Sequence, residues 1–386
     1  MIKRIEIEPI PLTEGCSKLV LKVERGIIVE GYYYALVPIR GFETLLLDKE
    51  APFATVAATR ICGMCQAVHS IAAAKAIEDA CNIEVPEAAE KLREALNLAV
   101  RVYNHLLHHI VISGNMFEDK DERFEFIKGV QRIRKNISTI MEIIGGEFVH
   151  PPNVVVGGIS SSIDKSVRER LINLADESIP LAEKETKRFI DYINHIWKKR
   201  NLPDNLGSHN LDFFIAEDFH SEDIEELYPQ EVFPEFPFKR EATNTLVKVK
   251  GKAVETGVRA RKVKKEGFKP SGGIKELHIL RAEEIISALK KMKTILEENT
   301  FNRELWNREF PVSDGETTGT GIVEAPRGVN IHQVRVDKSG KITYYKIVVP
   351  TAINMLAIAE ALKGEKVEYA EMVVRAYDPC IACATH

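Results

Sequence analysis

The sequence predicts an α+β fold in which a central bundle of long helices is flanked by small peripheral β-sheets. The N-terminal stretch is rich in branched and alternating residues, which is typical of strands. The next stretch repeats apolar residues at three- and four-residue steps, which is typical of amphipathic helices. Two Cys-x-x-Cys pairs stand far apart in the chain. If both pairs meet at one metal site, residues 1–386 form a single domain.

The N-terminal β region covers about residues 1–50. Residues 5–10, 18–24 and 26–37 alternate or are rich in branched side chains, so each is expected to form a strand. Arg25-Gly26 lies between the second and third of these stretches and predicts a hairpin turn.

The helical core covers about residues 66–198. An Ala-rich helix should follow Cys65 and end before Asn82, and Pro86 suits the first turn of a long helix. A further helix should end at Gly145-Gly146. The helix after that should run from about 165 to 197, with a kink or break at Pro180. In the long helix, one buried face is expected to carry Ala89, Leu92, Leu96, Ala99, Tyr103, Leu106 and Ile110.

The region of about 200–350 is mixed. A helix near 280–298 carries charges of both signs, which we interpret as a solvated face. Short strands are expected at 245–251 and 252–257, and longer ones at 321–328, 329–336 and 341–349. Two short helices should then lead through a C-terminal segment of about 351–386.

Composition excludes several classes of protein. Hydrophobic residues make up 45% and charged residues 28% of the chain, as in ordinary globular proteins, which argues against bulk disorder. The net charge of −4 gives no reason to expect a nucleic-acid partner. The N-terminus lacks the apolar core of a signal peptide, and no apolar run approaches the roughly 20 residues that span a bilayer. We therefore expect a cytoplasmic protein without direct membrane insertion.

The strongest signal is the cysteine pattern. Four of the six cysteines form two pairs, Cys62 with Cys65 and Cys380 with Cys383, while Cys16 is expected to be a buried thiol. We expect the same of Cys81. Four thiolates select zinc, iron, nickel or copper over magnesium or calcium.

A structural zinc site is one interpretation of the two pairs, but three features weigh against it. The pairs are separated by most of the chain, and the second lies at the C-terminus, where a structural clip would fray. Each pair is followed by a histidine, His69 and His386. A thioredoxin-like redox motif is a further alternative, although neither pair has a βαβ context.

At this point the residues resemble a known family. Residues 60–65, RICGMC, followed by His69, resemble the N-terminal motif of nickel–iron hydrogenase large subunits, and residues 378–386, DPCIACATH, resemble their C-terminal motif. The resemblance continues at 40–43, 157–158, 324–328 and 349–354. Chain length and C-terminal sequence look most like the alpha subunits of coenzyme F420-reducing hydrogenases of methanogenic archaea. The resemblance implies the large-subunit fold of that family.

The resemblance implies a nickel ion bound by four thiolates, two of which bridge to an iron that carries carbon monoxide and cyanide. Cys62 and Cys380 would be terminal ligands of nickel, and Cys65 and Cys383 would bridge the two metals. Cys380 would also be the first acceptor of the proton released when H2 is cleaved.

The resemblance also assigns roles around the metals. Glu14 would relay protons, and Arg327 would lie over the open face of the metals. Pro350 and Thr351 would surround a cyanide ligand, and His69 would orient a thiolate. The alternatives are a surface turn residue for Glu14, a turn arginine for Arg327, a strand end for Pro350 and Thr351, and a core histidine for His69.

Glu43 and His386 match ligands of a second site in the family, which holds magnesium or iron. Family members are usually cut after this histidine by a maturation protease once nickel-insertion proteins have loaded the metal. Three departures leave the tuning of the proton path and of the arginine open. They are Leu12 in place of arginine, Cys16 in place of histidine, and Asn115 in place of aspartate.

The implied function is interconversion of H2 with protons and electrons. The chain has no further cysteine set for a cluster, so electrons should leave through an iron–sulfur small subunit, and a flavoprotein subunit should then reduce coenzyme F420. The alternative is a divergent paralogue without activity, a scaffold that binds zinc or nothing.

Overall fold

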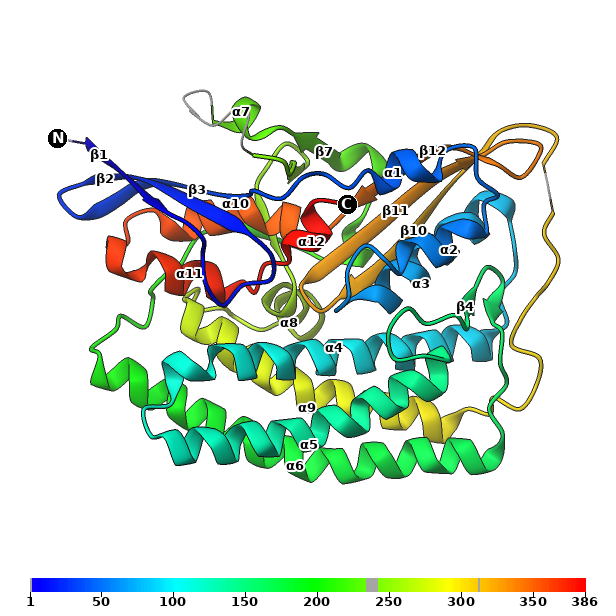
Figure 1. The fold of residues 1–386 in the computed structure, drawn as a ribbon, viewed down its shortest axis with the longest axis horizontal. Helices are drawn as coiled ribbons and strands as arrows, with labels where there is room; N and C mark the ends of the chain where they lie inside the picture. The colour runs from blue at the N-terminus through cyan, green and yellow to red at the C-terminus, as the bar shows by residue number, and fades with distance from the viewer. Residues whose placement is uncertain (1, 234–241, 312) are drawn as a thin grey trace.

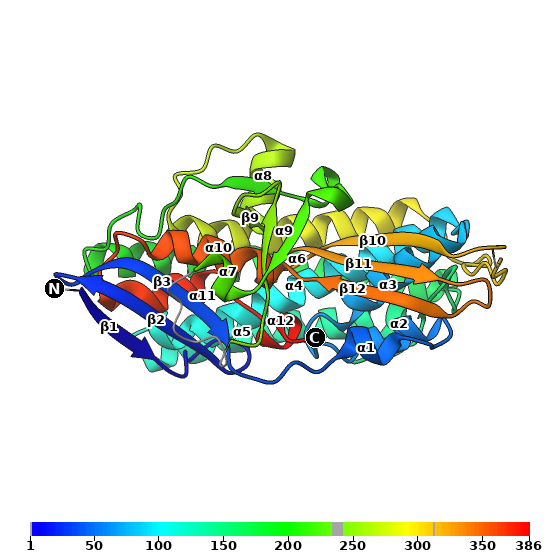
Figure 2. The same cartoon turned by 90° about the horizontal axis from the view of Figure 1, so that it is seen from above.

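The computed structural model describes residues 2–233, 242–311 and 313–386. Long helices form one layer of the molecule, and sheets and short helices form a second layer above it (Figure 1). Seen from above, one sheet lies at each end of the upper layer, and the C-terminus lies between them (Figure 2). The mixture of helices and small sheets confirms the predicted α+β class.

The sheet at one end is antiparallel, with strand order β1-β2-β3. The turn Arg25-Gly26 joins β2 to β3, which confirms the expected hairpin, and its residues have φ values of 51° and 84°. Positive φ at both positions is what a tight hairpin turn with the strands' right-handed twist requires. The β region ends earlier than predicted, because two short helices follow β3. These elements are β1 (Ile2–Ile7), β2 (Ser17–Glu24), β3 (Ile27–Ala35), α1 (Phe42–Leu46) and α2 (Phe53–Ala58).

The lower layer is a helical bundle in which each helix packs against two others. α4 contacts α5, α5 contacts α6, α6 contacts α9, and α9 contacts α4. Side chains of Asp119 and Asp164 cap α5 and α6 by accepting backbone N–H groups of the first turn. The expected interruption at Pro180 is wrong in one respect, since α6 continues through it without a break. Pro180 is exposed, so water can bond the carbonyl that the proline leaves without a partner, while contacts with α5 and α9 hold the helix in place. The helices are α4 (Glu87–Met116), α5 (Lys120–Gly145), α6 (Lys165–Lys199) and α9 (Ile274–Glu298).

The face of α9 that we interpreted as solvated is partly buried, which corrects that prediction. α9 packs against both α4 and α6, so its charged residues Arg281 and Glu284 are each only 5% exposed. Buried charges are tolerated only when they have partners: Glu284 accepts hydrogen bonds from Arg261, and Arg281 donates to His108 and to the Ala376 carbonyl. In α4 the predicted face is buried at five positions, whereas Tyr103 and Ile110 are only half-buried against the same core; the five are Ala89, Leu92, Leu96, Ala99 and Leu106.

The second sheet is antiparallel, with order β10-β11-β12, and α3 lies across β10. α3 ends at Asn82 as predicted, because Asn82 adopts the left-handed conformation (φ 50°) that stops a helix. Gly319 and Gly321 bring β10 against the helix backbone, since a Cβ at Gly321 would lie 2.0 Å from the Ala72 carbonyl oxygen. The elements are α3 (Gln66–Cys81), β10 (Thr317–Ala325), β11 (Gly328–Val336) and β12 (Ile342–Val348).

The C-terminal segment runs between the two sheets (Figure 2). α10 packs against β3 and β9, and the two short helices after it bring the chain end to the centre of the upper layer. These are α10 (Pro350–Leu362), α11 (Ala370–Ala376) and α12 (Ile381–Ala384). The short strands expected at 245–251 and 252–257 are present. The remaining elements are β4 (Val154–Val155), β5 (Gly158–Ile159), β6 (Asp212–Phe214), β7 (Ile224–Leu227), α7 (Pro229–Val232), β8 (Leu246–Val249), β9 (Val254–Thr256) and α8 (Val258–Glu266), with single 3₁₀ turns at Ala216–Asp218, Ser221–Asp223 and Val367–Tyr369.

One large cluster of buried apolar side chains extends from β2 to α12, which supports our proposal of a single domain. Among the described residues, no helix has the length and apolar character needed to cross a bilayer.

The contact of β10 with α3 gives a prediction about stability. Gly321→Ala should destabilise the protein by about 2 kcal/mol or more, because the added methyl group meets helix backbone that cannot move aside. Gly315→Ala is the control, since nothing lies within 4 Å of a Cβ built there. The midpoint of urea unfolding should fall for the first variant alone, and equal midpoints would contradict the packing described.

Candidate metal centre

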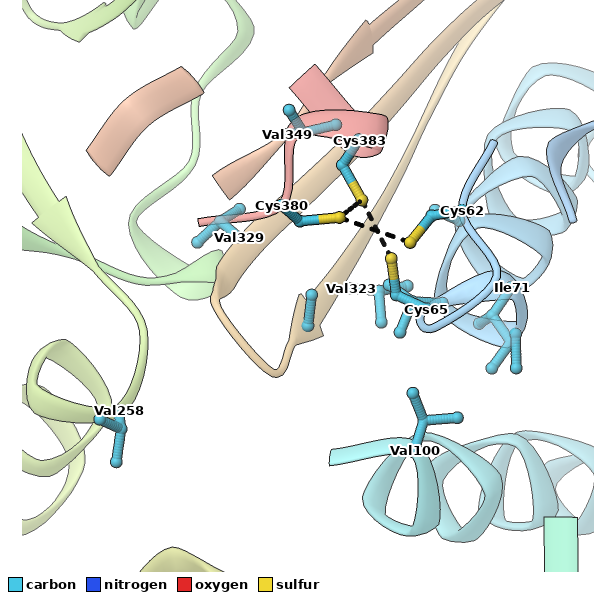
Figure 3. Close-up of a cluster of buried hydrophobic side chains, with 14 of the residues drawn as sticks. Cys62, Cys65, Ile71, Val100, Val258, Val323, Val329, Val349, Cys380 and Cys383 are labelled. Carbon is cyan, nitrogen blue, oxygen red and sulfur yellow. Dashed lines mark hydrogen bonds between the residues drawn. The ribbon is translucent and has the colours of Figure 1, made fainter. Parts of the chain in front are cut away.

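The two cysteine pairs meet at one point inside the molecule (Figure 3). Cys62 lies in the turn between α2 and α3, and Cys65 is the N-cap of α3. Cys380 is the N-cap of α12, and Cys383 lies within that helix. The N-terminal end of α3 carries a partial positive charge that favours a thiolate at Cys65, as do hydrogen bonds from Cys380 and Cys383, but Cys62 and burial outweigh them and raise the pKa of the Cys65 thiol.

All four sulfur atoms lie within 4.8 Å of one another, and all four residues are buried. The Sγ atoms of Cys62 and Cys380 are 3.4 Å apart, and those of Cys65 and Cys383 are 3.1 Å apart. Metal–sulfur bonds of about 2.3 Å around a tetrahedral ion would place sulfurs roughly 3.8 Å apart. The spacing therefore suits ligands that share one metal site.

The chemistry of this donor set fits a soft metal. All the cysteines are free thiols, and hydrogen bonding from the other three sulfurs holds the pKa of the Cys62 thiol well below its ordinary value. A thiolate is the form that binds metal. The sulfurs alone suit nickel, iron or zinc, so the groups around them must distinguish these metals.

Arg40 ties the two cysteine segments together. Its guanidinium donates to the carbonyl oxygens of Ile61 (2.6 Å) and Ala382, each next to a cysteine of the site. Its Nε also donates to the Thr385 carbonyl at 3.3 Å. Arg40 stands in a stretch that resembles the family, but the sequence predicts no role for it, because the carbonyl groups it binds become neighbours only in the folded chain.

Glu14 contacts the sulfur cluster directly. Its Oε2 lies 3.3 Å from Cys380 Sγ and accepts a hydrogen bond of 2.8 Å from the Ala382 amide. Its backbone forms an isolated parallel bridge with Cys380. The carboxylate is thus directed at the thiol, which disfavours the surface-turn alternative.

The two neighbours of Glu14 that depart from the family pattern are both exposed. Leu12 is 38% exposed, and Cys16 is also exposed, so our expectation of a buried thiol at Cys16 is wrong. β2 begins at Ser17 and is buried on both faces over its first residues, whereas Cys16 lies just before the strand, in the exposed loop that follows Glu14. Cys81 is buried as expected, and burial raises the pKa of its thiol.

Arg327 lies in the turn between β10 and β11 and is 8% exposed. It pairs with Asp378 Oδ2 at 2.9 Å, and its Nη1 donates to Asn104 Oδ1 at 3.1 Å. Burial opposes its charge, but Asp378 and the nearby thiols outweigh burial and raise the pKa of the guanidinium. The side chain of Asn115, which we expected to replace an acidic partner of Arg327, lies outside the described residues. Among the described residues, the acidic partner of Arg327 is Asp378.

The remaining predicted residues lie close by. Thr351 Oγ1 accepts a 3.0 Å hydrogen bond from the Cys380 amide, and Pro350 is the first residue of α10. His69 Nδ1 lies 3.0 Å from His332 Nε2, so its described side-chain partner is another histidine. Burial lowers the pKa of His69 to about 4 and keeps the ring neutral. Its action on a thiolate stays a prediction.

The residues expected at a second metal site are also neighbours. His386 Nε2 lies 3.5 Å from Glu43 Oε1, which accepts a 2.8 Å hydrogen bond from the Ile347 amide. Burial opposes the charge of Glu43, but His386 outweighs it and lowers the pKa of the carboxyl. His386 Nδ1 lies 2.8 Å from the Cys383 carbonyl, which couples this pair to the cysteine site. An imidazole beside a carboxylate fits magnesium or iron.

Both the sequence and the fold of this chain match known proteins. Residues 40–117 and 274–386 match the profile of a family described as nickel-dependent hydrogenase, and these stretches contain both cysteine pairs. A coenzyme F420 hydrogenase subunit alpha of Methanocaldococcus jannaschii is 36% identical, with 99% of this chain and 94% of the relative covered. The corresponding subunit of Methanothermobacter thermautotrophicus is 33% identical over 100% of this chain and 95% of the relative. The solved Ni-Fe-Se hydrogenase from D. vulgaris Hildenborough shares the fold, with a TM-score of 0.83 at 21% identity and full coverage of both chains.

The geometry predicts that the four sulfurs act as one ligand set. Cys65→Ser should remove most of the tightly bound transition metal, because a serine hydroxyl is a poor soft ligand and is not ionised at neutral pH. Cys81→Ser is the matched control, since Cys81 is buried outside the cluster. Elemental analysis of the purified protein measures both. Retention of full metal content by Cys65→Ser would contradict the site.

Proposed function

The chain belongs to the nickel-dependent hydrogenase family as a catalytic large subunit, and on this premise we propose that it cleaves and forms H2 heterolytically at a nickel–iron centre. Electrons would pass to an iron–sulfur small subunit and on to coenzyme F420. The observation that carries the proposal is the convergence on one buried point of four sulfurs, a carboxylate directed at Cys380 and the paired guanidinium of Arg327.

The proposed ligand roles follow the family pattern. Cys62 and Cys380 would be terminal ligands of nickel, and Cys65 and Cys383 would bridge nickel to an iron that carries carbon monoxide and cyanide. Such a centre supplies the site at which H2 is polarised and split. Thr351, which bonds the Cys380 amide, and Pro350 would lie against a cyanide ligand.

The chain supplies the route for the proton. Cys380 Sγ would accept it and pass it to Glu14 Oε2, 3.3 Å away. A carboxylate at this distance can both take and release a proton. Glu14 is only partly buried, so it can pass the proton outward from the cluster.

Arg327 would provide a fixed positive charge beside the sulfurs. Its ion pair with Asp378 and its bond to Asn104 hold the guanidinium in one orientation. Because the raised pKa keeps it protonated at working pH, its role is electrostatic positioning rather than proton transfer.

The electrons would leave through partner subunits. Four of the six cysteines are used at the site and the other two stand apart, so the chain has no cysteine set for a cluster of its own. The relatives are named as alpha subunits, which implies a complex. The iron–sulfur small subunit would dock over α1 and α2, where Leu45, Phe53 and Val56 are 43–52% exposed close to the turn that carries Cys62. A flavoprotein subunit that reduces coenzyme F420, a maturation protease and nickel-insertion proteins complete the proposed partners, all in the cytoplasm.

A zinc-binding scaffold is the alternative function. Four buried thiols alone would suit it. A structural zinc site needs neither a carboxylate directed at one ligand nor a buried arginine beside the sulfurs, so these two features favour the enzyme.

The proposed relay predicts that metal binding and proton transfer can be separated. Glu14→Gln should keep nickel and iron bound, because all four thiols remain, but should slow turnover about a hundredfold or more, because an amide cannot titrate. Glu8→Gln is the control, since Glu8 is exposed and pairs with Lys18 instead. Hydrogen–deuterium exchange with H2 gas measures the step. A Glu14→Gln rate equal to wild type would show that the proton leaves by another route.

The second metal site predicts a role for the last residue. Deleting His386 should lower the nickel content of the purified complex, because the chain end loses its contact with Glu43 and the Cys383 carbonyl. Glu43→Gln should act in the same direction, and His195→Ala, at an exposed position, should have no effect. Full metal content together with full hydrogen uptake by the deletion variant would contradict the assignment of His386 to a second metal site.

A further inference from the structure

In the turn that carries Arg327, successive backbone carbonyl groups accept hydrogen bonds from side chains. The carbonyl oxygen of Glu324 accepts hydrogen bonds of 3.0 Å from Asn97 and from Arg101, both on α4. Arg261 on α8 donates to the next two carbonyls, Ala325 at 3.1 Å and Pro326 at 3.2 Å. Asn354 on α10 donates to the carbonyl of Arg327 itself at 3.2 Å. Four successive carbonyls therefore have side-chain donors from three different helices.

We propose that Arg261 and Asn354 are positioning residues that fix Arg327 relative to Cys380. The proposal rests on the proposed function in one respect, namely that Arg327 acts at the metal centre. Asn354 lies in a stretch that resembles the family and Arg261 does not, but the sequence assigned neither residue a role. Neither contacts the sulfurs in the described structure. Both would act on the reaction only through the place of the Arg327 guanidinium.

Arg261 is buried, and two carboxylates hold its guanidinium group in one orientation. Its Nε and Nη2 each lie 2.7 Å from a carboxylate oxygen of Glu284 on α9, and its Nη1 lies 2.9 Å from Glu324 Oε2 on β10. The planar guanidinium presents five N–H donors in one rigid plane, which lysine cannot do. Because its carboxylate partners hold that plane, the two bonds to the turn have a defined direction. Arg261 is only 5% exposed, so water cannot replace it readily.

Asn354 links the turn to the cysteine site through a single helix. Thr351, one helical turn earlier on α10, accepts the hydrogen bond of the Cys380 amide. The Asn354 amide also bonds both backbone groups of Thr256, accepting from its N–H at 3.0 Å and donating to its C=O at 3.1 Å. The same short stretch of α10 thus sets the positions of both Arg327 and Cys380.

The neighbouring backbone leaves no room for the turn to relax. Gly257 follows Thr256, and a Cβ built there would lie 2.8 Å from the Arg327 carbonyl oxygen. Thr256 Oγ1 accepts a 3.0 Å hydrogen bond from the Val329 amide on the far side of the turn. Without Asn354, the turn would lose a direct bond and the support of Thr256 together. A misplacement of about 1 Å at a reacting centre can cost roughly a hundredfold in rate.

The test uses Asn354→Ala and Arg261→Lys in the complete complex, with Leu362→Ala as the matched control. Leu362 is also buried on α10 but packs against β3, where a Cβ at Gly31 would meet its side chain. We expect both positioning variants to keep their nickel and iron. We expect a loss of about ten- to a hundredfold in hydrogen oxidation and faster backbone amide exchange at residues 327–329. Leu362→Ala should leave exchange at those residues unchanged.

Double variants with Arg327→Lys separate positioning from general destabilisation. If Asn354 acts through Arg327, adding Asn354→Ala to Arg327→Lys should cost little further activity, whereas Leu362→Ala should have the same effect in either background. The proposal would be overturned if the activity losses of Asn354→Ala and Arg327→Lys multiplied in the double variant. It would also be overturned if amide exchange at residues 327–329 were unchanged in Asn354→Ala. Should Arg261→Lys not fold, Asn354→Ala decides alone. A wild-type complex without hydrogen oxidation would refute the proposed function, and amide exchange would then decide the positioning role.

Discussion

The structure depends on bringing the two cysteine pairs together, although paired sulfurs are 318 residues apart in the sequence. Ionised sulfurs gathered at one buried point repel one another until a cation neutralises them, so other contacts must hold the segments that carry them. Arg40 binds carbonyls of both segments, Glu14 bonds the Ala382 amide, and Thr351 holds the Cys380 amide. Glu14 lies in the loop before β2, Arg40 in the loop before α1, and Thr351 in the first turn of α10, so three separate segments hold the site together.

Fixed charge surrounds the site. Burial opposes ionisation of Asp378, but Arg327 outweighs burial and holds the pKa of this carboxyl well below its usual range. His108 lies 3.1 Å from Asp378, and burial lowers the pKa of this histidine to about 4, so the ring is a neutral donor. Arg281 lies against the other nitrogen of that ring, and burial lowers its pKa only to about 10, so it stays protonated. The groups around Arg327 therefore keep the same protonation states across the physiological pH range.

Local patterns in the sequence predicted those parts of the fold that depend on near neighbours. The hairpin at Arg25-Gly26, the end of α3 at Asn82 and the cysteine pairs each have a signal within a few residues. The errors have another origin. The charges of α9 looked solvated because their partners come from α4 and α8. Cys16 looked buried because the sequence did not show that it lies in the exposed loop before β2.

The supporting residues of the site show the same limit. Arg40 and Asp378 stood within motifs that resembled the family, but their partners could not be read from the sequence. Nothing near Arg261 or Asn354 marks either as a donor to the turn of Arg327, because the two helices and that turn are distant in sequence. Side-chain bonds to backbone carbonyls leave no periodic pattern, so only the folded chain shows them.

The most direct test of the central claim is an infrared spectrum of the purified complex, together with its metal content. Carbon monoxide and cyanide bound to a metal absorb in a window that protein leaves empty. If Cys62, Cys65, Cys380 and Cys383 hold a nickel–iron centre, the spectrum should show these bands and nickel and iron should be present in equal amounts. Zinc bound by the four cysteines, with no bands in that window, would contradict the account.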